Sequence, residues 1–283
     1  MRSRPARSLL VVAYAAASLF FSGFAACSPA RGASAGKAAP DPRMARALAA
    51  LDAAAADPAL AALFPAAELE ATRARIAASP ARFLELLAQA EADRAADPAL
   101  LRRVDKKPGG ALAETYAPAD LVALDGTGLS VSRPGHRLRR PAFDALRDMD
   151  AAARAAGLVL LVSSSYRSYA YQKDVFARNA AQDGLERARM LSAEPGRSQH
   201  QLGSAIDFGS IDDTFATTRE GQWLSRNARR FGFSASYPKG MEALTGYLWE
   251  SWHYRYVGKA AAALEEEFLG GLQARMIAFM ERY

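Results

Sequence analysis

The segment PGRSQHQLGSAID at residues 195–207 decides both the fold and the chemistry expected for this chain. Gly203 permits a tight turn after His200, because glycine tolerates backbone conformations that other residues avoid. The alternation of the AIDF segment at residues 205–208 predicts a strand that turns its isoleucine and phenylalanine to one side and Asp207 to the other. Asp207 is therefore predicted to face back toward His200.

A second segment, ESWHYRYVG at residues 250–258, carries another histidine and another carboxylate. Glu250 and His253 are three residues apart, a spacing that aligns side chains on a helix but opposes them on a strand. The aromatic composition of residues 249–256 favours a strand. A turn or bulge between Glu250 and His253 is therefore required if both are to face one site.

These two segments contain the donor set of a zinc hydrolase. Such an enzyme needs three nitrogen or oxygen ligands, an open fourth position for water, and a separate carboxylate that accepts the proton of that water. Four residues supply this set: His200, Asp207, Glu250 and His253. The only other histidine, His136, is expected to be an exposed loop residue.

Together with SSYRS at residues 164–168, Gln172 and the Tyr237-Pro238 pair, the two segments resemble the VanY-type D-alanyl-D-alanine carboxypeptidases, zinc peptidases related to lysostaphin and the hedgehog fold. The resemblance runs from about residue 116 to the C-terminus. One departure is Ser204, which stands where the family usually has Gly or Leu. The resemblance implies an α+β fold, with a small antiparallel sheet and flanking helices in residues 116–283.

The resemblance also implies roles for individual residues. His200, Asp207 and His253 would bind one Zn²⁺ per chain, Glu250 would be the catalytic base, and Arg167 would stabilise the oxyanion or the substrate carbonyl. Substrate contacts are expected from Ser165, Gln172, Ser198 and Tyr237.

The implied reaction is removal of the terminal D-alanine from peptidoglycan stem peptides by metal-activated water. Two alternatives stay open: an L,D-carboxypeptidase acting on tetrapeptide stems, and a non-catalytic peptidoglycan-binding lipoprotein. The free carboxylate of Glu250 argues against the second, because a structural zinc site needs no such group.

The N-terminus has the features of a bacterial export signal. Three arginines within the first seven residues precede an apolar stretch at residues 9–21. The GFAAC segment at residues 23–27 resembles a lipoprotein signal box, with phenylalanine in place of the usual leucine. We therefore expect a signal peptide at residues 1–26, a lipidated Cys27 at the start of a flexible tether (27–43), and a location in the cell envelope, facing the periplasm or cell wall. An ordinary signal peptide with an incidental cysteine is the alternative.

Residues 44–106 are rich in alanine and have a helical hydrophobic period, which predicts a helical segment outside the resemblance. Asp57-Pro58, Ser79-Pro80 and Asp97-Pro98 are each expected to start a helix, with a capping side chain before a proline. The KPGG segment at residues 107–110 is expected to mark a domain boundary.

Further along, apolar residues at helical spacing predict a helix that ends near Gly157, followed by a buried strand at residues 158–162. That strand would deliver residues 163–167, including Arg167, to its end. Thr217 and Glu220 fit a capping box at the start of another helix.

Composition limits the remaining possibilities. The chain has 283 residues, 51% of them hydrophobic, which suffices for a full core. The 36 Lys and Arg against 30 Asp and Glu give a net charge of +6, and three of those arginines lie in the export signal. A mildly basic chain without a long basic run gives little reason to expect a nucleic-acid partner, and no glycine-rich nucleotide motif occurs. The single cysteine excludes a disulfide framework and a Cys-rich zinc site.

Overall fold

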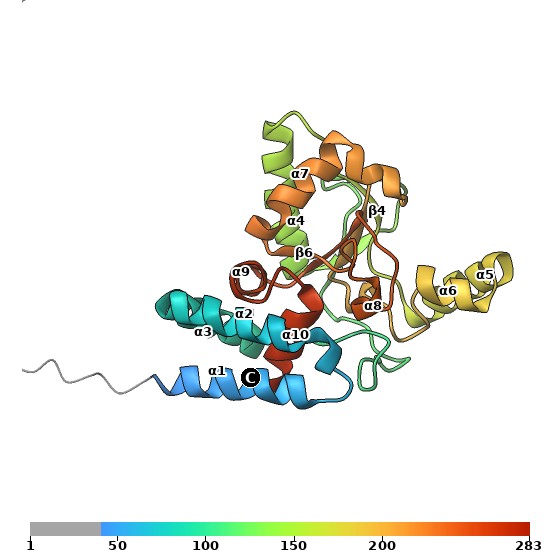
Figure 1. Ribbon diagram of the computed structural model, residues 1–283. Coiled ribbons are helices and arrows are strands. Elements are labelled where there is room, and N and C mark those ends of the chain that lie inside the picture. The colour runs from blue at the N-terminus through green and yellow to red at the C-terminus, as the bar shows by residue number, and fades with distance from the viewer. Residues whose placement is uncertain (1–40) are drawn as a thin grey trace, which may run out of the picture. The chain divides into compact units, whose positions relative to one another are not determined.

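The computed structural model describes residues 41–283, and its centre is a five-stranded sheet (Figure 1). The strand order is β2-β4-β5-β7-β6, in which β2 and β4 are parallel and the other neighbours are antiparallel. The strands are β2 (Ser130–Val131), β4 (Leu161–Ser164), β5 (Ala205–Phe208), β7 (His253–Tyr256) and β6 (Phe233–Ala235). Small sheets combined with helices confirm the predicted α+β class.

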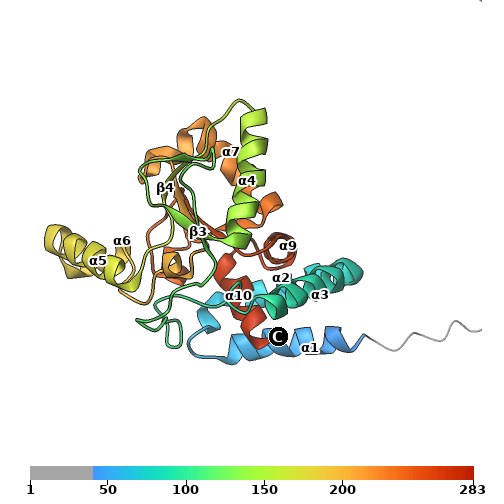
Figure 2. The ribbon, with the colours of Figure 1, turned by 180° about the vertical axis from the view of Figure 1, so that it is seen from behind.

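One hydrophobic core lies between this sheet and the helices α4 (Arg140–Ala155) and α7 (Arg219–Asn227), the latter continued by the 3₁₀ helix η4 (Ala228–Phe231). Ile206 and Phe208 of β5 are fully buried in this core. Figures 1 and 2 show α4 and α7 beside the sheet in both views. The predicted alternation along residues 205–208 is confirmed, and it leaves Asp207 on the opposite side of the strand.

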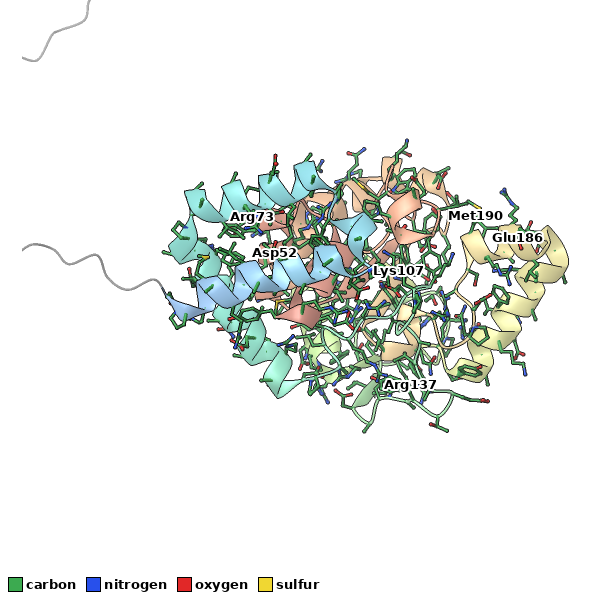
Figure 3. The ribbon with its side chains drawn as sticks, turned by 60° about the horizontal axis from the view of Figure 1, so that its bottom comes forward. Asp52, Arg73, Lys107, Arg137, Glu186 and Met190 are labelled. Atoms are coloured by element: carbon green, nitrogen blue, oxygen red, sulfur yellow. The ribbon has the colours of Figure 1, made fainter. Side chains whose placement is uncertain are left out.

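A second core joins the N-terminal helices to the C-terminal ones. It contains buried residues from α1 (Pro42–Ala56), α2 (Ala66–Ala78), α3 (Pro80–Ala96), α9 (Lys259–Phe268) and α10 (Gln273–Arg282). Asp52 of α1 and Arg73 of α2 form an ion pair on the outside of this group of helices (Figure 3). Residues 40–283 form one compact unit. Three α-helices therefore lie within residues 42–96, residues 97–106 form turns and coil, and residues 107–110 lie inside this compact unit.

Two of the three expected helix starts are corrected. Asp57 and Asp97 follow the last residues of α1 and α3, and the chain then makes short turns, the first leading into the 3₁₀ helix η1 (Ala61–Leu63). Their side chains accept hydrogen bonds from the backbone two residues on, at 2.8 and 3.1 Å. The following proline disfavours helical conformation in the residue before it, so the aspartate ends the helix. Pro80 does begin α3, although the Ser79 side chain makes no capping bond.

A helical hairpin, α5 (Tyr169–Asp183) and α6 (Leu185–Leu191), projects from the body in both ribbon views (Figures 1 and 2). It buries only Gln172 and Ala188 fully. Figure 3 shows Glu186 and Met190 on this projection. The remaining elements are β1 (Leu121–Ala123) paired with β3 (Arg137–Arg139), the 3₁₀ helices η2 (Gln199–Leu202) and η3 (Asp213–Thr217), and α8 (Glu242–Thr245).

The start of one predicted strand and the capping residue of one predicted helix differ from the structure by one to three residues. Strand β4 begins at Leu161 instead of 158, and the residue that caps α7 is Thr218, whose hydroxyl accepts from the Gly221 N–H at 3.0 Å. The predicted export signal and Cys27 lie outside the described residues. Among residues 41–283, no helix combines the length and the hydropathy needed to cross a bilayer.

Candidate active site

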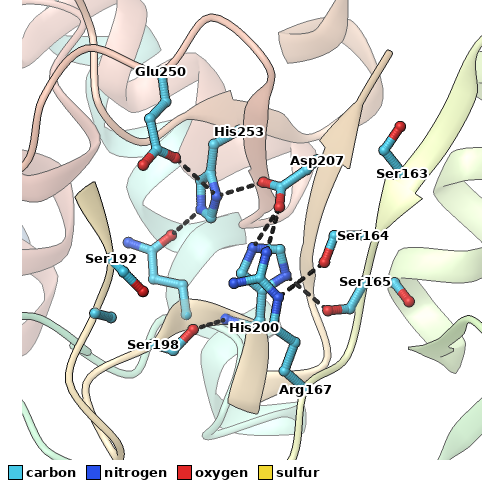
Figure 4. A network of polar contacts seen from close by, with 12 residues as sticks. Ser163, Ser164, Ser165, Arg167, Ser192, Ser198, His200, Asp207, Glu250 and His253 are labelled. Carbon is cyan, nitrogen blue, oxygen red and sulfur yellow. Dashed lines mark hydrogen bonds and ion pairs between the residues drawn. The ribbon is translucent and has the colours of Figure 1, made fainter. Parts of the chain in front are cut away.

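Strands β5 and β7 bring the two sequence motifs together. Asp207 pairs directly with His253 in the antiparallel register, so their side chains project from adjacent positions on the same face of the sheet. The Nδ1 atom of His253 lies 2.9 Å from Oδ1 of Asp207 (Figure 4). Both side chains are almost completely buried, at 4% and 3% exposed.

His200 approaches the same carboxylate from the turn before β5. It lies in η2, whose first N–H groups are capped by the Ser198 hydroxyl, which accepts from the His200 N–H at 3.3 Å. Gly203 then reverses the chain with a φ of +70°, a conformation that L side chains rarely adopt. The Nε2 atom of His200 ends 3.2 Å from Oδ2 of Asp207.

The donor set fits a zinc ion. One ligand atom from each of His200, Asp207 and His253 lies within 4.8 Å of the others, and all three residues are buried. The Nδ1 atom of His200 is 2.7 Å from the carbonyl oxygen of Ser165, which can only accept, so Nδ1 carries the hydrogen. The Nε2 lone pair of His200 is consequently left buried and without a hydrogen-bond partner. Two imidazoles and one carboxylate are a common ligand set for catalytic zinc.

Glu250 stands beside this cluster without being part of it. The residues Ser251 and Trp252 form a bend before β7, which is the turn that the sequence required between Glu250 and His253. Oε2 of Glu250 lies 3.5 Å from Nδ1 of His253, and the side chain is 14% exposed (Figure 4). In the protein without metal, burial raises the pKa of Glu250 to about 7, although the nearby His253 opposes this shift. A carboxyl with such a pKa can both accept and return a proton near neutral pH.

Arg167 reaches the cluster from the loop after β4. Its Nη2 donates to Oδ2 of Asp207 at 2.6 Å, and its Nε donates to the Ser164 hydroxyl at 2.9 Å (Figure 4). Burial alone would raise the pKa of Asp207, but the contacts with His200 and Arg167 hold it well below its ordinary value. Burial and the Arg167 charge together lower the pKa of His200 to about 4. Neutral imidazole and ionised carboxylate are the forms that bind a metal.

The expected substrate-contact residues divide into two pairs. Ser198 and Tyr237 line a cavity of about 330 Å³ that also contains the three candidate ligands, Glu250 and Arg167. Gln172 is fully buried behind Arg167, and its amide nitrogen donates to the Ala193 carbonyl at 2.8 Å. The hydroxyl of Ser165 instead accepts from the Arg137 N–H at 3.1 Å, away from the cavity lining. Gln172 and Ser165 thus occupy positions that support the cavity wall.

The expectation for His136 is wrong. This residue is 3% exposed, and its ring nitrogens lie 3.0 Å from the Ser165 hydroxyl and 3.2 Å from the Ser132 hydroxyl. It therefore packs behind the same backbone segment whose carbonyl accepts from His200. Burial lowers the pKa of His136.

Sequence reasoning missed Arg133, a second arginine in the cavity wall. It is exposed, its Nη2 lies 3.4 Å from the Tyr171 hydroxyl, and no carboxylate among residues 41–283 lies within ion-pair distance of it. No local sequence motif surrounds Arg133. It becomes a cavity residue only because its loop lies beside β4 in the fold. A second cavity of about 370 Å³ shares Leu191, Glu250 and Trp252 with the first.

Comparison with known proteins agrees with this geometry. A family model, VanY, described as D-alanyl-D-alanine carboxypeptidase, matches residues 135–259, which contain all three candidate ligands, Arg167 and Glu250. YodJ of Bacillus subtilis, whose name assigns it to the carboxypeptidases, is 38% identical over 164 residues, covering 56% of this chain and 60% of that protein. A D-alanyl-D-alanine carboxypeptidase of Enterococcus faecalis is 38% identical over 127 residues, covering 41% of this chain and 47% of the enzyme. This chain thus spans about half the length of these two relatives.

Solved structures extend the agreement to the fold. The LdcB LD-carboxypeptidase matches with a TM-score of 0.56 and 35% identity, covering 63% of this chain and 84% of that chain. VanYB in complex with D-alanine-D-alanine matches with a TM-score of 0.52 and 30% identity, and the match covers 61% of this chain and 94% of that chain. A VanY D,D-pentapeptidase in complex with Zn(II) matches with a TM-score of 0.53 and 29% identity, covering 63% and 98%. With motifs, site geometry and fold all in agreement, this chain belongs to the VanY family of D-alanyl-D-alanine carboxypeptidases.

Proposed function

We propose that the protein is a zinc-dependent carboxypeptidase that removes the terminal D-alanine from peptidoglycan stem peptides. The observation that carries the proposal is the buried cluster of His200, Asp207 and His253 with the separate carboxylate of Glu250 beside it. Zinc bound by the three ligands would lower the pKa of a coordinated water to about 7 and polarise a peptide carbonyl.

The chain's own residues supply the proton transfers. Glu250 accepts a proton from the attacking water and returns it to the amine of the departing D-alanine, which needs one carboxyl group that changes protonation state within the cycle. Its position at the edge of the cluster, 3.5 Å from His253 and outside the ligand set, supports this role. Among residues 41–283 the other carboxylate in the cavity wall is Asp207, which accepts from Arg167 and lies against both histidines as a proposed ligand.

Two arginines would stabilise the negative charges of the substrate. Arg167 is 18% exposed and anchored by Ser164 and Asp207, so its guanidinium is held in the cavity wall, and we assign it to the charge that develops on the carbonyl oxygen. Arg133 has no carboxylate partner among residues 41–283 and faces the same cavity, so we assign it to the C-terminal carboxylate of the peptide. A carboxypeptidase needs such a contact, because the free carboxylate distinguishes a chain end from an internal bond.

A second candidate is L,D-carboxypeptidase activity on tetrapeptide stems, which the likeness to the LdcB LD-carboxypeptidase favours. The two differ in the chirality of the residue before the scissile bond, so one experiment separates them. Purified protein loaded with zinc is incubated with defined pentapeptide and tetrapeptide stems, and the products are identified by mass spectrometry. Loss of one D-alanine from the pentapeptide alone is the expected result, loss from the tetrapeptide alone identifies the L,D-enzyme, and cleavage of neither refutes both.

We further propose that the enzyme acts outside the cytoplasm, anchored through a lipid on Cys27. The proposal rests on the sequence of residues 1–27 and on the location of peptidoglycan stems in the cell envelope.

A further inference from the structure

A buried chain of hydrogen bonds runs from His253 to the C-terminal helix α10. The Nε2 atom of His253 lies 3.2 Å from Oε1 of Gln199, and the Gln199 amide nitrogen donates to Oε1 of Gln273 at 3.2 Å. The Gln273 amide nitrogen in turn donates to the carbonyl oxygen of Ser234 at 3.1 Å. The Ser236 hydroxyl lies 2.7 Å from Oε1 of Gln199 and 3.2 Å from Oε1 of Gln273, and its one hydrogen can go to either oxygen. All five residues are less than 8% exposed.

The donor and acceptor directions in this series of hydrogen bonds are set by the Ser234 carbonyl. A backbone carbonyl has no hydrogen, so the group of Gln273 that faces Ser234 must be the amide nitrogen. Its oxygen therefore faces Gln199, which must present its own nitrogen there and its oxygen to His253. An amide oxygen can only accept, so Nε2 of His253 has to carry a hydrogen.

A hydrogen on Nε2 determines the state of Nδ1, the other ring nitrogen of His253. With hydrogen on Nε2, the Nδ1 atom of neutral His253 has a free lone pair, and this atom points at Asp207, 2.9 Å away. His200 is oriented by the same logic, because its Nδ1 donates to the Ser165 carbonyl and leaves Nε2 free. Each histidine is thus oriented by a backbone carbonyl, directly for His200 and through two glutamines for His253.

The helical body holds the start of α10 in place. Arg275, 4% exposed, donates through Nε to the Leu63 carbonyl at 2.7 Å and through Nη1 to the Leu269 carbonyl at 2.8 Å. Its Nη1 also lies 3.2 Å from a carboxylate oxygen of Glu68 in α2. The N-terminal helices therefore fix the helix turn that carries Gln273.

We propose that Gln273 is a positioning residue for the metal site: acting through Gln199, it holds His253 in the Nε2-protonated form whose Nδ1 can bind zinc. The inference rests on the proposed zinc site and gives the helical segment at residues 42–96 a role in supporting it. Groups that orient a ligating histidine typically contribute 10- to 100-fold to metal affinity.

The test compares zinc affinity in variants by competition with a chromophoric chelator. Gln273→Met keeps the size of the side chain but removes its acceptor, which frees the Gln199 amide to rotate, so we expect zinc binding to weaken by roughly 10- to 100-fold. Met276→Ala is the matched control, because Met276 is fully buried in the same helix outside the network. It should lower Tm and leave zinc affinity unchanged.

A rescue variant tests whether His253 needs a hydrogen-bond acceptor at Nε2. In Gln199→Glu combined with Gln273→Met, the carboxylate presents an acceptor to His253 in either orientation, so zinc affinity should recover most of the loss. An independent readout is the imidazole Nε2–H signal of His253 in ¹H–¹⁵N spectra of the zinc-loaded protein. It should be protected from exchange in the parent and the rescue variant, and exchange-broadened in Gln273→Met.

The outcomes that overturn the inference are distinct from failure of the proposed function. Equal zinc affinity in parent and Gln273→Met, an equal loss in Met276→Ala, or no recovery in the double variant would each refute the positioning role. A parent protein that binds no zinc would refute the proposed zinc site itself.

Discussion

Replacing Glu250 by glutamine separates the proposed base from the proposed ligands. Glutamine has the shape of glutamate but cannot accept a proton at the pH of the reaction. Because Glu250 lies 3.5 Å from His253 and outside the cluster of three ligand atoms, the substitution should leave zinc stoichiometry unchanged. The backbone N–H of Glu250 donates to the Tyr237 carbonyl at 3.0 Å, a bond that the variant keeps.

The size of the effect follows from what else could act as a base. General acid–base catalysis contributes roughly 10² to 10⁴ in rate, which at about 1.4 kcal/mol per tenfold equals about 3 to 5 kcal/mol of transition-state stabilisation. Asp207 cannot substitute, because its carboxylate accepts from Arg167 and lies against the two histidines as a proposed metal ligand. We therefore expect kcat to fall toward the upper part of that range while KM changes little.

The assay follows release of D-alanine from a pentapeptide stem under saturating substrate, with bound zinc quantified in the same samples. Glu186→Gln is the matched control, since Glu186 is 87% exposed on the projecting hairpin and should behave as the parent. A Glu250→Gln variant with parental kcat would refute the role of Glu250 as base. Loss of zinc from that variant would instead show that Glu250 belongs to the metal site.

Four further predictions follow from other parts of the molecule. Arg133→Gln should raise KM for peptides with a free C-terminal carboxylate and leave the weak binding of peptides with a C-terminal amide unchanged. Inhibition by the acid and amide forms of one peptide measures this difference. Equal effects on the acid and the amide would show that Arg133 does not recognise the carboxylate. Arg167→Lys should lower kcat more than it raises KM in steady-state kinetics, because lysine lacks the planar fork that donates to both Ser164 and Asp207. Burial raises the pKa of Glu265 despite the neighbouring Arg229, so the folded state retains this proton to higher pH than the unfolded state, and stability should fall as pH rises above the ordinary carboxyl pKa. Urea unfolding of Glu265→Gln should show a smaller decline over that range, and an unchanged profile would contradict the assignment. Cys27→Ser should release the protein from membranes on fractionation, whereas unchanged fractionation with an unmodified mature N-terminus would support a simple signal peptide.

The first half of the site was predictable because its geometry is local. Strand alternation alone sets the direction of Asp207, and the glycine at 203 alone permits the turn after His200. The second half was predictable only as a requirement, namely that a turn must separate Glu250 from His253, and the bend at residues 251–252 meets it. The antiparallel pairing that places Asp207 opposite His253 joins positions 46 residues apart, which no local pattern encodes.

Where prediction failed, a distant partner decided the outcome. His136 looked like a loop residue because its neighbours are polar, but it is buried against the segment that follows β4, where its Nδ1 lies 3.0 Å from the Ser165 hydroxyl. Arg133 has no motif around it and becomes part of the cavity only through the same strand. The Asp-Pro pairs at 57 and 97 have the composition of a helix start, yet the same two residues can end a helix, and the choice depends on what the following turn packs against.

The match to the VanY family ends at residue 259, but the support for the metal site does not. Strand β7, which carries His253, is held from behind by the fully buried Arg255, whose Nη2 donates to the carbonyl oxygens of Leu100 and Arg102 at 2.9 and 2.8 Å. Gln273, beyond the other end of the match, reaches the same histidine through Gln199. Because a zinc site depends on ligands held in fixed orientation, the residues that hold them belong to the functional unit as much as the ligands do. The residues on both sides of the match therefore contribute to holding the proposed metal site in place.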